Sequence, residues 1–423
     1  MSQSEELKLN YLPAELLHQI FRDVDDGDRK NLRLICRLFA NVCAKYMIHS
    51  CTFSTSRDTL RKLKHMAAHP IFSAYIDELN FDCSLLVNIP DQSLFHSHLR
   101  WLNESVEQSQ RQFSVYRPLS EAQNEIILSG EDVRTFEFAI PRFPKFTTLR
   151  ICMGCFGNGG RQQKEALAGH LGNVPLYAIR QSSACSVRQF MTLMSILFQQ
   201  KVRLSVLEVG PLTYSVFDED LELVEGVFSS LKKLVFCISG VKDTPWPPQL
   251  QASFSGSEAF CDVVGNGKAM KLLSSASLLT HLSISTEDAP FHKEANLKSF
   301  VGNYTWPSLK RLSIGNLVVS EKDLIEFLLR HRVEELSIRS ITLQGSWITA
   351  LPAMREATNP ALDQAIAYEW ITSEAGESWY LGRHPAKSIV GRGGETTLGL
   401  HVAYFLSKAP CSYPCPLTLS NMS

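Results

Sequence analysis

Two pairs of cysteines have spacings that metal-binding or redox chemistry uses. Cys152 and Cys155 form a C-x-x-C pair, and Cys411 and Cys415 lie far along the chain. A structural zinc ion takes four ligands, and no second pair with matched spacing lies near Cys152. A redox dithiol opens a helix, whereas a glycine-rich stretch, residues 156–160, follows Cys155. We therefore predict neither a metal nor a redox site here.

Histidines and glycines offer the remaining candidate chemistry. His65 and His69 are four residues apart on an expected helix, but no third ligand accompanies them, so we interpret them as exposed histidines on a basic face. The glycine-rich stretches Gly154–Gly160 and Gly391–Gly394 match neither phosphate-binding fingerprint, and no G-x-S-x-G or H-E-x-x-H occurs. The prediction is a non-enzyme with no catalytic, metal or cofactor-binding residues.

Composition excludes further classes. The chain has 423 residues, of which 44% are hydrophobic and 20% charged, and its formal net charge is −1. No global basic field favours nucleic acid, and no apolar run approaches the roughly 20 residues that cross a bilayer. The polar, acidic first residues do not resemble a secretory signal, and eleven irregularly spaced cysteines indicate reduced thiols. We expect a cytoplasmic or nuclear protein that binds neither nucleic acid nor membrane.

The elements that must do the work begin with Leu12–Met47, where apolar residues recur at helical spacing. A turn at Asp25–Asp28 separates two expected helices. The first helix carries one stripe, formed by Leu12, Leu16, Leu17, Ile20, Phe21 and Val24. The second helix carries another, formed by Leu32, Ile35, Cys36, Phe39, Val42, Cys43 and Tyr46. Leu34 and Leu38 occupy a different face of that second helix, and a unit this small cannot bury both faces. Either a partner protein or the rest of the chain must cover the surplus.

The same stretch resembles an F-box. The resemblance rests on Leu12-Pro13-x-Glu15-Leu16-Leu17-x-x-Ile20-Phe21 and on Leu32-Arg33-Leu34-Ile35-Cys36-Arg37-x-Phe39. It departs from the family at Asp26 and Arg29, where leucines are usual. In the family, this module docks on the Skp adaptor of a cullin–RING ubiquitin ligase. The resemblance implies that the residues facing the adaptor or forming the module core are Leu12, Pro13, Leu16, Ile20, Phe21, Leu34, Ile35 and Phe39.

A second pattern recurs in the middle of the chain. Five units read L-x-x-L-x-L or a close variant, and they begin at Leu204, Leu231, Leu279, Leu309 and Val333. This is the leucine-rich-repeat signature, in which each unit contributes one short strand to a shared core. An unrelated α/β domain is the alternative. The long interval between the second and third units predicts a disguised unit near Phe254–Val263.

The expected fold is α/β: a small all-α F-box module followed by an irregular leucine-rich-repeat-like solenoid. We place the module at 11–50, a helical linker or cap at 51–145, a substrate-binding array at 146–350 and a loosely ordered tail at 351–423. The segments around Tyr116–Ile151 and Leu309–Trp347 also resemble fungal F-box proteins. Trp246 and Trp306 lie in expected loops, as partner anchors or as rings packed under their own loops.

These expectations define a function. The resemblance implies a substrate-recognition adaptor of a Skp–cullin–F-box ligase, which binds the Skp adaptor through the F-box and an unknown protein substrate through the array. The alternative is a leucine-rich-repeat interaction scaffold with no ligase role, whose N-terminal helices fold back on the array.

Overall fold

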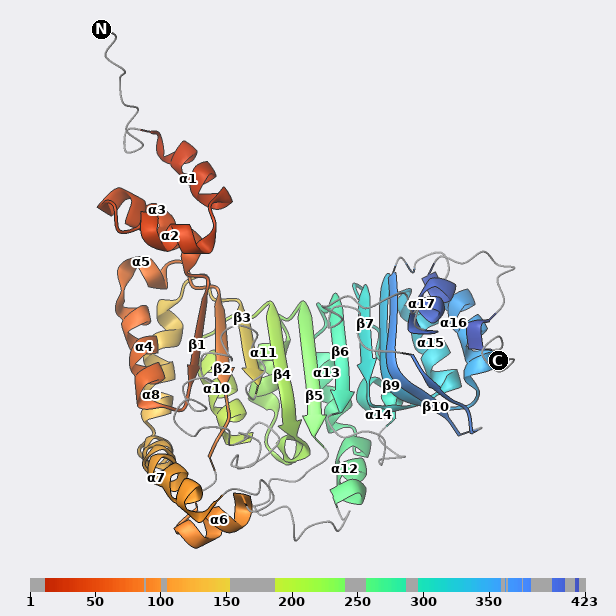
Figure 1. Ribbon diagram of the computed structural model, residues 1–423. Helices are drawn as coiled ribbons and strands as arrows, with labels where there is room; N and C mark the ends of the chain where they lie inside the picture. The colour runs from red at the N-terminus through yellow and green to blue at the C-terminus, as the bar shows by residue number, and fades with distance from the viewer. Residues whose placement is uncertain are drawn as a thin grey trace.

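The computed structural model describes residues 12–86, 89–99, 105–152, 187–239, 256–286, 296–358, 362, 364–374, 376–381, 398–407 and 415–417. Within these ranges the chain is an α/β protein built on one large, mostly parallel β-sheet (Figure 1). The α/β class predicted from the sequence is confirmed.

Eleven strands in the described ranges form this sheet. They are β1 (Ser50–Ser54), β2 (Glu78–Asp82), β3 (Thr148–Cys152), β4 (Val206–Thr213), β5 (Lys233–Ser239), β6 (His281–Thr286), β7 (Arg311–Gly315), β8 (Val318–Ser320), β9 (Glu335–Gln344), β10 (Gln364–Ser373) and β11 (Ser378–Tyr380).

The strands lie side by side in chain order, as Figure 1 shows from β1 to β10. Every pairing from β1 to β10 is parallel, and β11 closes the sheet antiparallel to β10. The short β8 pairs with β9 beyond the end of β7. Sequential parallel strands require a covering segment between each pair, which is where the helices lie.

The apolar positions of the five repeated units stack in register across the sheet. Leu207, Leu234 and Leu282 are successive partners on β4, β5 and β6, and the ladder continues through Leu312 to Leu336. A second ladder, two residues further along each strand, runs through Val209, Phe236, Ile284, Ile314 and Ile338. All of these side chains are buried. Each unit therefore completes its core only with its neighbours.

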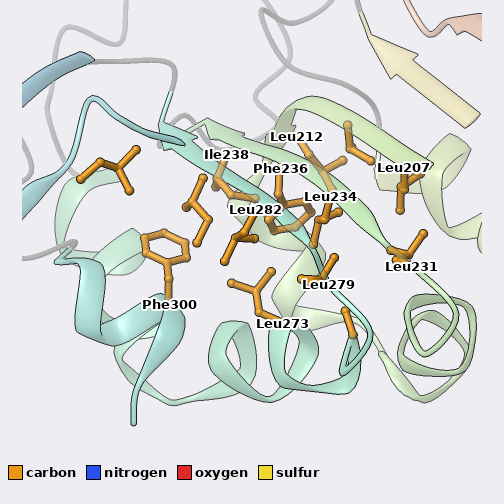
Figure 2. Close-up of a cluster of buried hydrophobic side chains, with 14 of the residues drawn as sticks. Leu207, Leu212, Leu231, Leu234, Phe236, Ile238, Leu273, Leu279, Leu282 and Phe300 are labelled. Atoms are coloured by element: carbon orange, nitrogen blue, oxygen red, sulfur yellow. The ribbon is translucent and has the colours of Figure 1, made fainter. Parts of the chain in front are cut away.

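Helices connect the strands and cover one face of the sheet, where Figure 2 shows the ladder residues pointing toward Leu273 and Phe300 of two of these helices. The helices are α4 (Arg57–Ala68), α5 (Pro70–Ser73), α6 (Gln92–Leu99), α7 (Val106–Ser129), α8 (Glu131–Ala139), α10 (Val187–Gln199), α11 (Glu222–Phe228), α12 (Gly256–Gly265), α13 (Lys268–Ser275), α14 (Leu297–Val301), α15 (Glu321–His331), α16 (Trp347–Thr358) and α17 (Leu398–Ser407). Short 3-10 helices lie at Ile140–Arg142 and Tyr214–Asp218.

The sheet extends beyond the range 146–350 given to the array. The expected linker contributes β1 and β2, and the expected tail contributes β10, β11 and α17. The disguised unit near Phe254–Val263 is wrong, because β5 pairs directly with β6 and the chain from Gly256 to Gly265 forms α12. The apolar residues of that helix belong to a covering element.

The first residues described form a separate helical module at the β1 end of the sheet (Figure 1). It contains α1 (Ala14–Asp23), α2 (Asp26–Leu32) and α3 (Arg37–Met47), so the prediction of two helices was wrong. The helical pattern breaks at residues 33–36, where the Leu34 and Ile35 amides bond only three residues back. The apolar periodicity of the sequence continues through this break and conceals it.

Candidate functional site

The helical module has a core of its own. Leu17 and Phe21 of α1 pack against Phe39, Val42 and Cys43 of α3, as a cluster distinct from the one beneath the sheet. The rings of Phe21 and Phe39 meet edge to face with their centroids 5.2 Å apart. Phe21 and Phe39 therefore belong to the core of the module and not to its surface. Leu12 is half-buried at the border of this core.

Arg29, one of the departures from the family pattern, joins the three helices. Its Nε donates to the Phe21 carbonyl at 2.8 Å, and its two terminal nitrogens donate to the carbonyls of Arg22 (2.8 Å) and Tyr46 (3.2 Å). The last carbonyls of a helix have no intrahelical partner. A guanidinium supplies donors and a positive charge to the negative ends of α1 and α3 at once.

Five large hydrophobic side chains remain exposed on this module: Leu16, Ile20, Leu34, Ile35 and Leu38. We call them the apolar patch. They are a third of the fifteen exposed large hydrophobic side chains in the described part of the chain. Leu16 and Ile20 are one helical turn apart on α1, and the other three lie in the turn before α3 and in its first turn. Exposed apolar residues concentrated in so small a unit are typical of interaction surfaces, which makes the apolar patch a candidate site.

Of the eight residues predicted for partner binding, three belong to the module core or its border and five are exposed. Phe21 and Phe39 lie in the core, and Leu12 borders it. Pro13 is exposed just before α1, where its carbonyl accepts the Leu16 and Leu17 amides. Leu16, Ile20, Leu34 and Ile35 belong to the apolar patch. Ile35, expected in the buried stripe of the second helix, is 65% exposed, because the break at residues 33–36 turns it outward.

The sheet contributes a second candidate surface. Side chains that alternate with the buried ladders point away from the helices, and we call this side the open face. A chain of ion pairs crosses four strands there. Arg150 on β3 contacts Glu78 at 2.5 Å and Glu208 at 2.9 Å, and Glu208 also contacts Lys233 on β5 at 2.6 Å. Further along, Arg311 pairs with Glu335 at 2.9 Å.

This surface was not predicted from the sequence, although the repeat contained its signal. The variable position between the last two apolar residues of each unit is occupied in turn by Glu208, Val235, Ser283, Ser313 and Ser337, and these lie in register on the open face. Reading those positions as one row would have located it.

Other candidates have structural explanations or fall outside the described residues. Trp306 is buried against Tyr304, Phe327 and His331, which favours the packed-ring interpretation. Residues 153–155, 411–414 and 246 and both glycine-rich stretches lie outside the described ranges. Within those ranges, no cluster of three or more His, Cys, Asp or Glu side chains is arranged to hold a metal ion.

The surroundings of two thiols, Cys51 and Cys43, and of His281 on the open face shift their pKa values. Burial raises the pKa of Cys51 to about 11 and also raises the pKa of Cys43, which disfavours the nucleophilic thiolate. Partial burial, then the nearby Arg311, lowers the pKa of His281, so this side chain is neutral at physiological pH.

None of the helices described is both long and apolar enough to span a bilayer. Comparison of the sequence with protein-family models and with curated proteins finds no match.

Proposed function

We propose that the chain is a substrate-recognition adaptor of a Skp–cullin–F-box ubiquitin ligase. In this proposal, the helical module is an F-box that docks on the Skp adaptor, and the sheet with its covering helices is a degenerate leucine-rich-repeat array that holds a protein substrate. The chain then acts by positioning, because it raises the effective concentration of the substrate at the ligase.

One observation carries the proposal: the apolar patch stays exposed although the module has a complete core of its own. Leu34 is 77% exposed, and burial of a leucine side chain is worth roughly 1.5–3 kcal/mol. Covering this patch with a partner therefore contributes a large favourable free energy to binding. The resemblance of the residue pattern to an F-box supports the Skp adaptor as that partner.

The alternative, a repeat scaffold without a ligase role, required the N-terminal helices to fold back on the array. The separation of the module core from the sheet core favours the docking proposal over it.

Co-purification tests the proposal. The full chain is expressed with a tagged Skp adaptor, as wild type and as Leu34→Glu/Ile35→Glu, which introduces two charges into the patch without touching the core. The matched control is Leu278→Glu, a change at a leucine that is 53% exposed and far from the module. We expect the adaptor to retain the wild type and the control but not the patch variant. Failure to retain the wild type contradicts the proposal.

A further inference from the structure

The two halves of the open face differ in the size of their side chains. From β2 to β5 the face carries long side chains that pair with one another, as described above. From β6 to β9 the corresponding row is Ser283, Ser313 and Ser337, which are partners in register. Short side chains on three adjacent strands leave the sheet surface lower there than on either side.

This low region is a depression of about 170 Å³, which we call the serine recess. The three serines form its floor. Its rim lies two residues earlier on each strand, on the same face, and is formed by Lys233, His281, Arg311 and Glu335. Lys233 and Arg311 each keep one carboxylate partner, but both remain about half exposed and have donors to spare.

Arg339 adds a cation on the opposite side of the floor. It lies two residues beyond Ser337 on β9, on the same face, and its register partner is Gly315. A Cβ built on Gly315 would lie 3.0 Å from the Arg339 Nε, so the absence of a side chain there lets the guanidinium extend over β7. Among the described residues, Arg339 has no ion-pair partner.

The groups around the recess are mostly hydrogen-bond donors. An unpaired guanidinium has five N–H donors in a fork that matches a carboxylate or a phosphate, and serine hydroxyls can donate to the same oxygens. The recess is lined by two cations, Lys233 and Arg311, and one carboxylate, Glu335. Just outside the lining, Glu208 pairs with Lys233, and Arg339 adds a third cation on the neighbouring row. The surroundings are thus locally positive in a chain whose formal net charge is −1.

We propose that the serine recess and Arg339 bind an extended polypeptide segment that carries anionic side chains, either Asp and Glu or phosphorylated Ser and Thr. This inference rests on the proposed function and deepens it, because it names the chemistry of the substrate. The chemistry shared by both sources is an anionic oxygen group that accepts hydrogen bonds from Arg339 and the serine floor.

The charges favour a polypeptide over a nucleic acid. Glu208 and Glu335 interrupt the row of cations, so no continuous basic track follows the face as a phosphate backbone requires. The described lining residues include no Phe, Tyr or Trp ring on which a base could stack.

Fluorescence anisotropy tests the inference with the full chain. The probes are fluorescein-labelled Gly-Ser peptides that carry a run of Glu, of phosphoserine, or of Gln as the neutral reference. The variants are Arg339→Ala, which removes the free cation, and Ser313→Tyr, which fills the recess and leaves every charge in place. The control is Lys322→Ala, which removes the same charge from an exposed position on α15.

We expect one or both anionic peptides to bind more tightly than the Gln peptide, with an affinity that falls as salt is added. Arg339→Ala weakens this binding roughly tenfold, the effect of one charge-assisted hydrogen bond. Ser313→Tyr weakens it as well, whereas Lys322→Ala does not. Whichever anionic peptide binds more tightly identifies the source of the charge.

Three results overturn the inference: equal binding of anionic and neutral peptides, unchanged binding by Arg339→Ala and Ser313→Tyr, or tighter binding of a single-stranded oligonucleotide than of either anionic peptide. Capture by the Skp adaptor is measured separately on the same preparations. Loss of peptide binding with adaptor capture intact therefore rejects the substrate chemistry alone, and loss of adaptor capture rejects the ligase role.

Discussion

The Arg29 guanidinium donates from Nε to the Phe21 carbonyl at 2.8 Å and so links the last turn of α2 to the end of α1. The same side chain also bonds to the ends of α1 and α3 through Arg22 and Tyr46. A position where the family pattern has an apolar residue is occupied here by a polar clamp. Arg29 thus joins the helices of the module, whose apolar patch stays exposed.

Replacement of Arg29 tests the clamp. Arg29→Met removes three hydrogen bonds to helix-end carbonyls and keeps an unbranched apolar stem, so we expect the module to lose about 1–3 kcal/mol of local stability. Hydrogen exchange of the full chain measures this loss, with faster exchange of α1 and α3 amides and unchanged exchange of β4–β7. Unchanged exchange in the module would mean that the clamp contributes no stability.

The buried carboxylate of Asp132 anchors α8 to α10. It accepts two hydrogen bonds from Arg188, at 2.8 and 3.3 Å, and one from the Val133 amide. Asp132→Ala leaves Arg188 without this partner, so we expect about 2–4 kcal/mol of destabilisation in urea unfolding. The matched control, Glu121→Ala, breaks the exposed pair with Arg117 and costs less than about 1 kcal/mol. Equal losses would refute the role of burial.

The repeated ladders predict that substitutions at neighbouring positions of one strand differ in their effect on the free energy of unfolding. Leu234 is buried under α-helices, whereas Val235 is half-buried on the open face. Leu234→Ala should cost about 2–5 kcal/mol because it removes core contacts and leaves a cavity. Val235→Ala should cost less than about 1.5 kcal/mol. Urea unfolding of both variants measures the difference, and a reversed order would contradict the assigned register.

Acid should destabilise the chain through His331. Its Nε2 accepts the Trp306 amide hydrogen at 3.2 Å, so the neutral ring must carry its proton on Nδ1, 2.9 Å from the Phe327 carbonyl. Burial lowers the pKa of His331 below its ordinary value of 6.5. Because the folded-state pKa is the lower one, the neutral ring's contribution is complete above that ordinary value and is lost as pH falls toward the folded-state pKa.

We therefore expect the free energy of unfolding to decrease as the pH falls below the ordinary histidine value of 6.5. His331→Gln should be less stable at neutral pH and should flatten this slope. It should not abolish the slope, because the pKa of His281 is lowered as well. An identical slope in wild type and variant would assign the pH dependence to other groups.

Deletion of residues 1–47 separates the proposed function from its alternative. The module core does not merge with the sheet core, so the remaining chain should melt within about 4 °C of the full chain. A scaffold that needs its N-terminal helices would lose its cooperative transition. Thermal unfolding followed by circular dichroism at a helix-sensitive wavelength distinguishes these outcomes.

The sequence was most informative where one constraint repeats. Each L-x-x-L-x-L unit had to bury the same alternate positions, so Leu207, Leu234, Leu282, Leu312 and Leu336 were identifiable before their register was known. The sequence was less informative at the break before α3. Ile35 fits the helical spacing of apolar residues, but the backbone there is not helical. Ser120 and Gln123 have the spacing of a helix capping box, yet Ser120 lies buried inside the long α7, because packing outweighs a local capping preference.

The candidate sites divide in the same way. The exposure of Leu34 and Leu38 followed from the helical period of the sequence, whereas Ile35 was expected in the buried stripe. The clamp by Arg29 and the ion pairs of Arg150 depend on which strands and helix ends become neighbours. Charged residues at those positions are indistinguishable from ordinary surface residues until the topology is known.

Hydrogen exchange of the full chain with and without purified Skp adaptor tests the central claim most directly, because it reports which surface the adaptor covers. The account predicts slower exchange in α1 and in residues 33–38 when the adaptor is bound, with no change in α15 or in β4–β7. It also predicts that Leu34→Glu/Ile35→Glu abolishes this protection. Unchanged exchange across residues 14–38, or protection confined to the sheet, would contradict it.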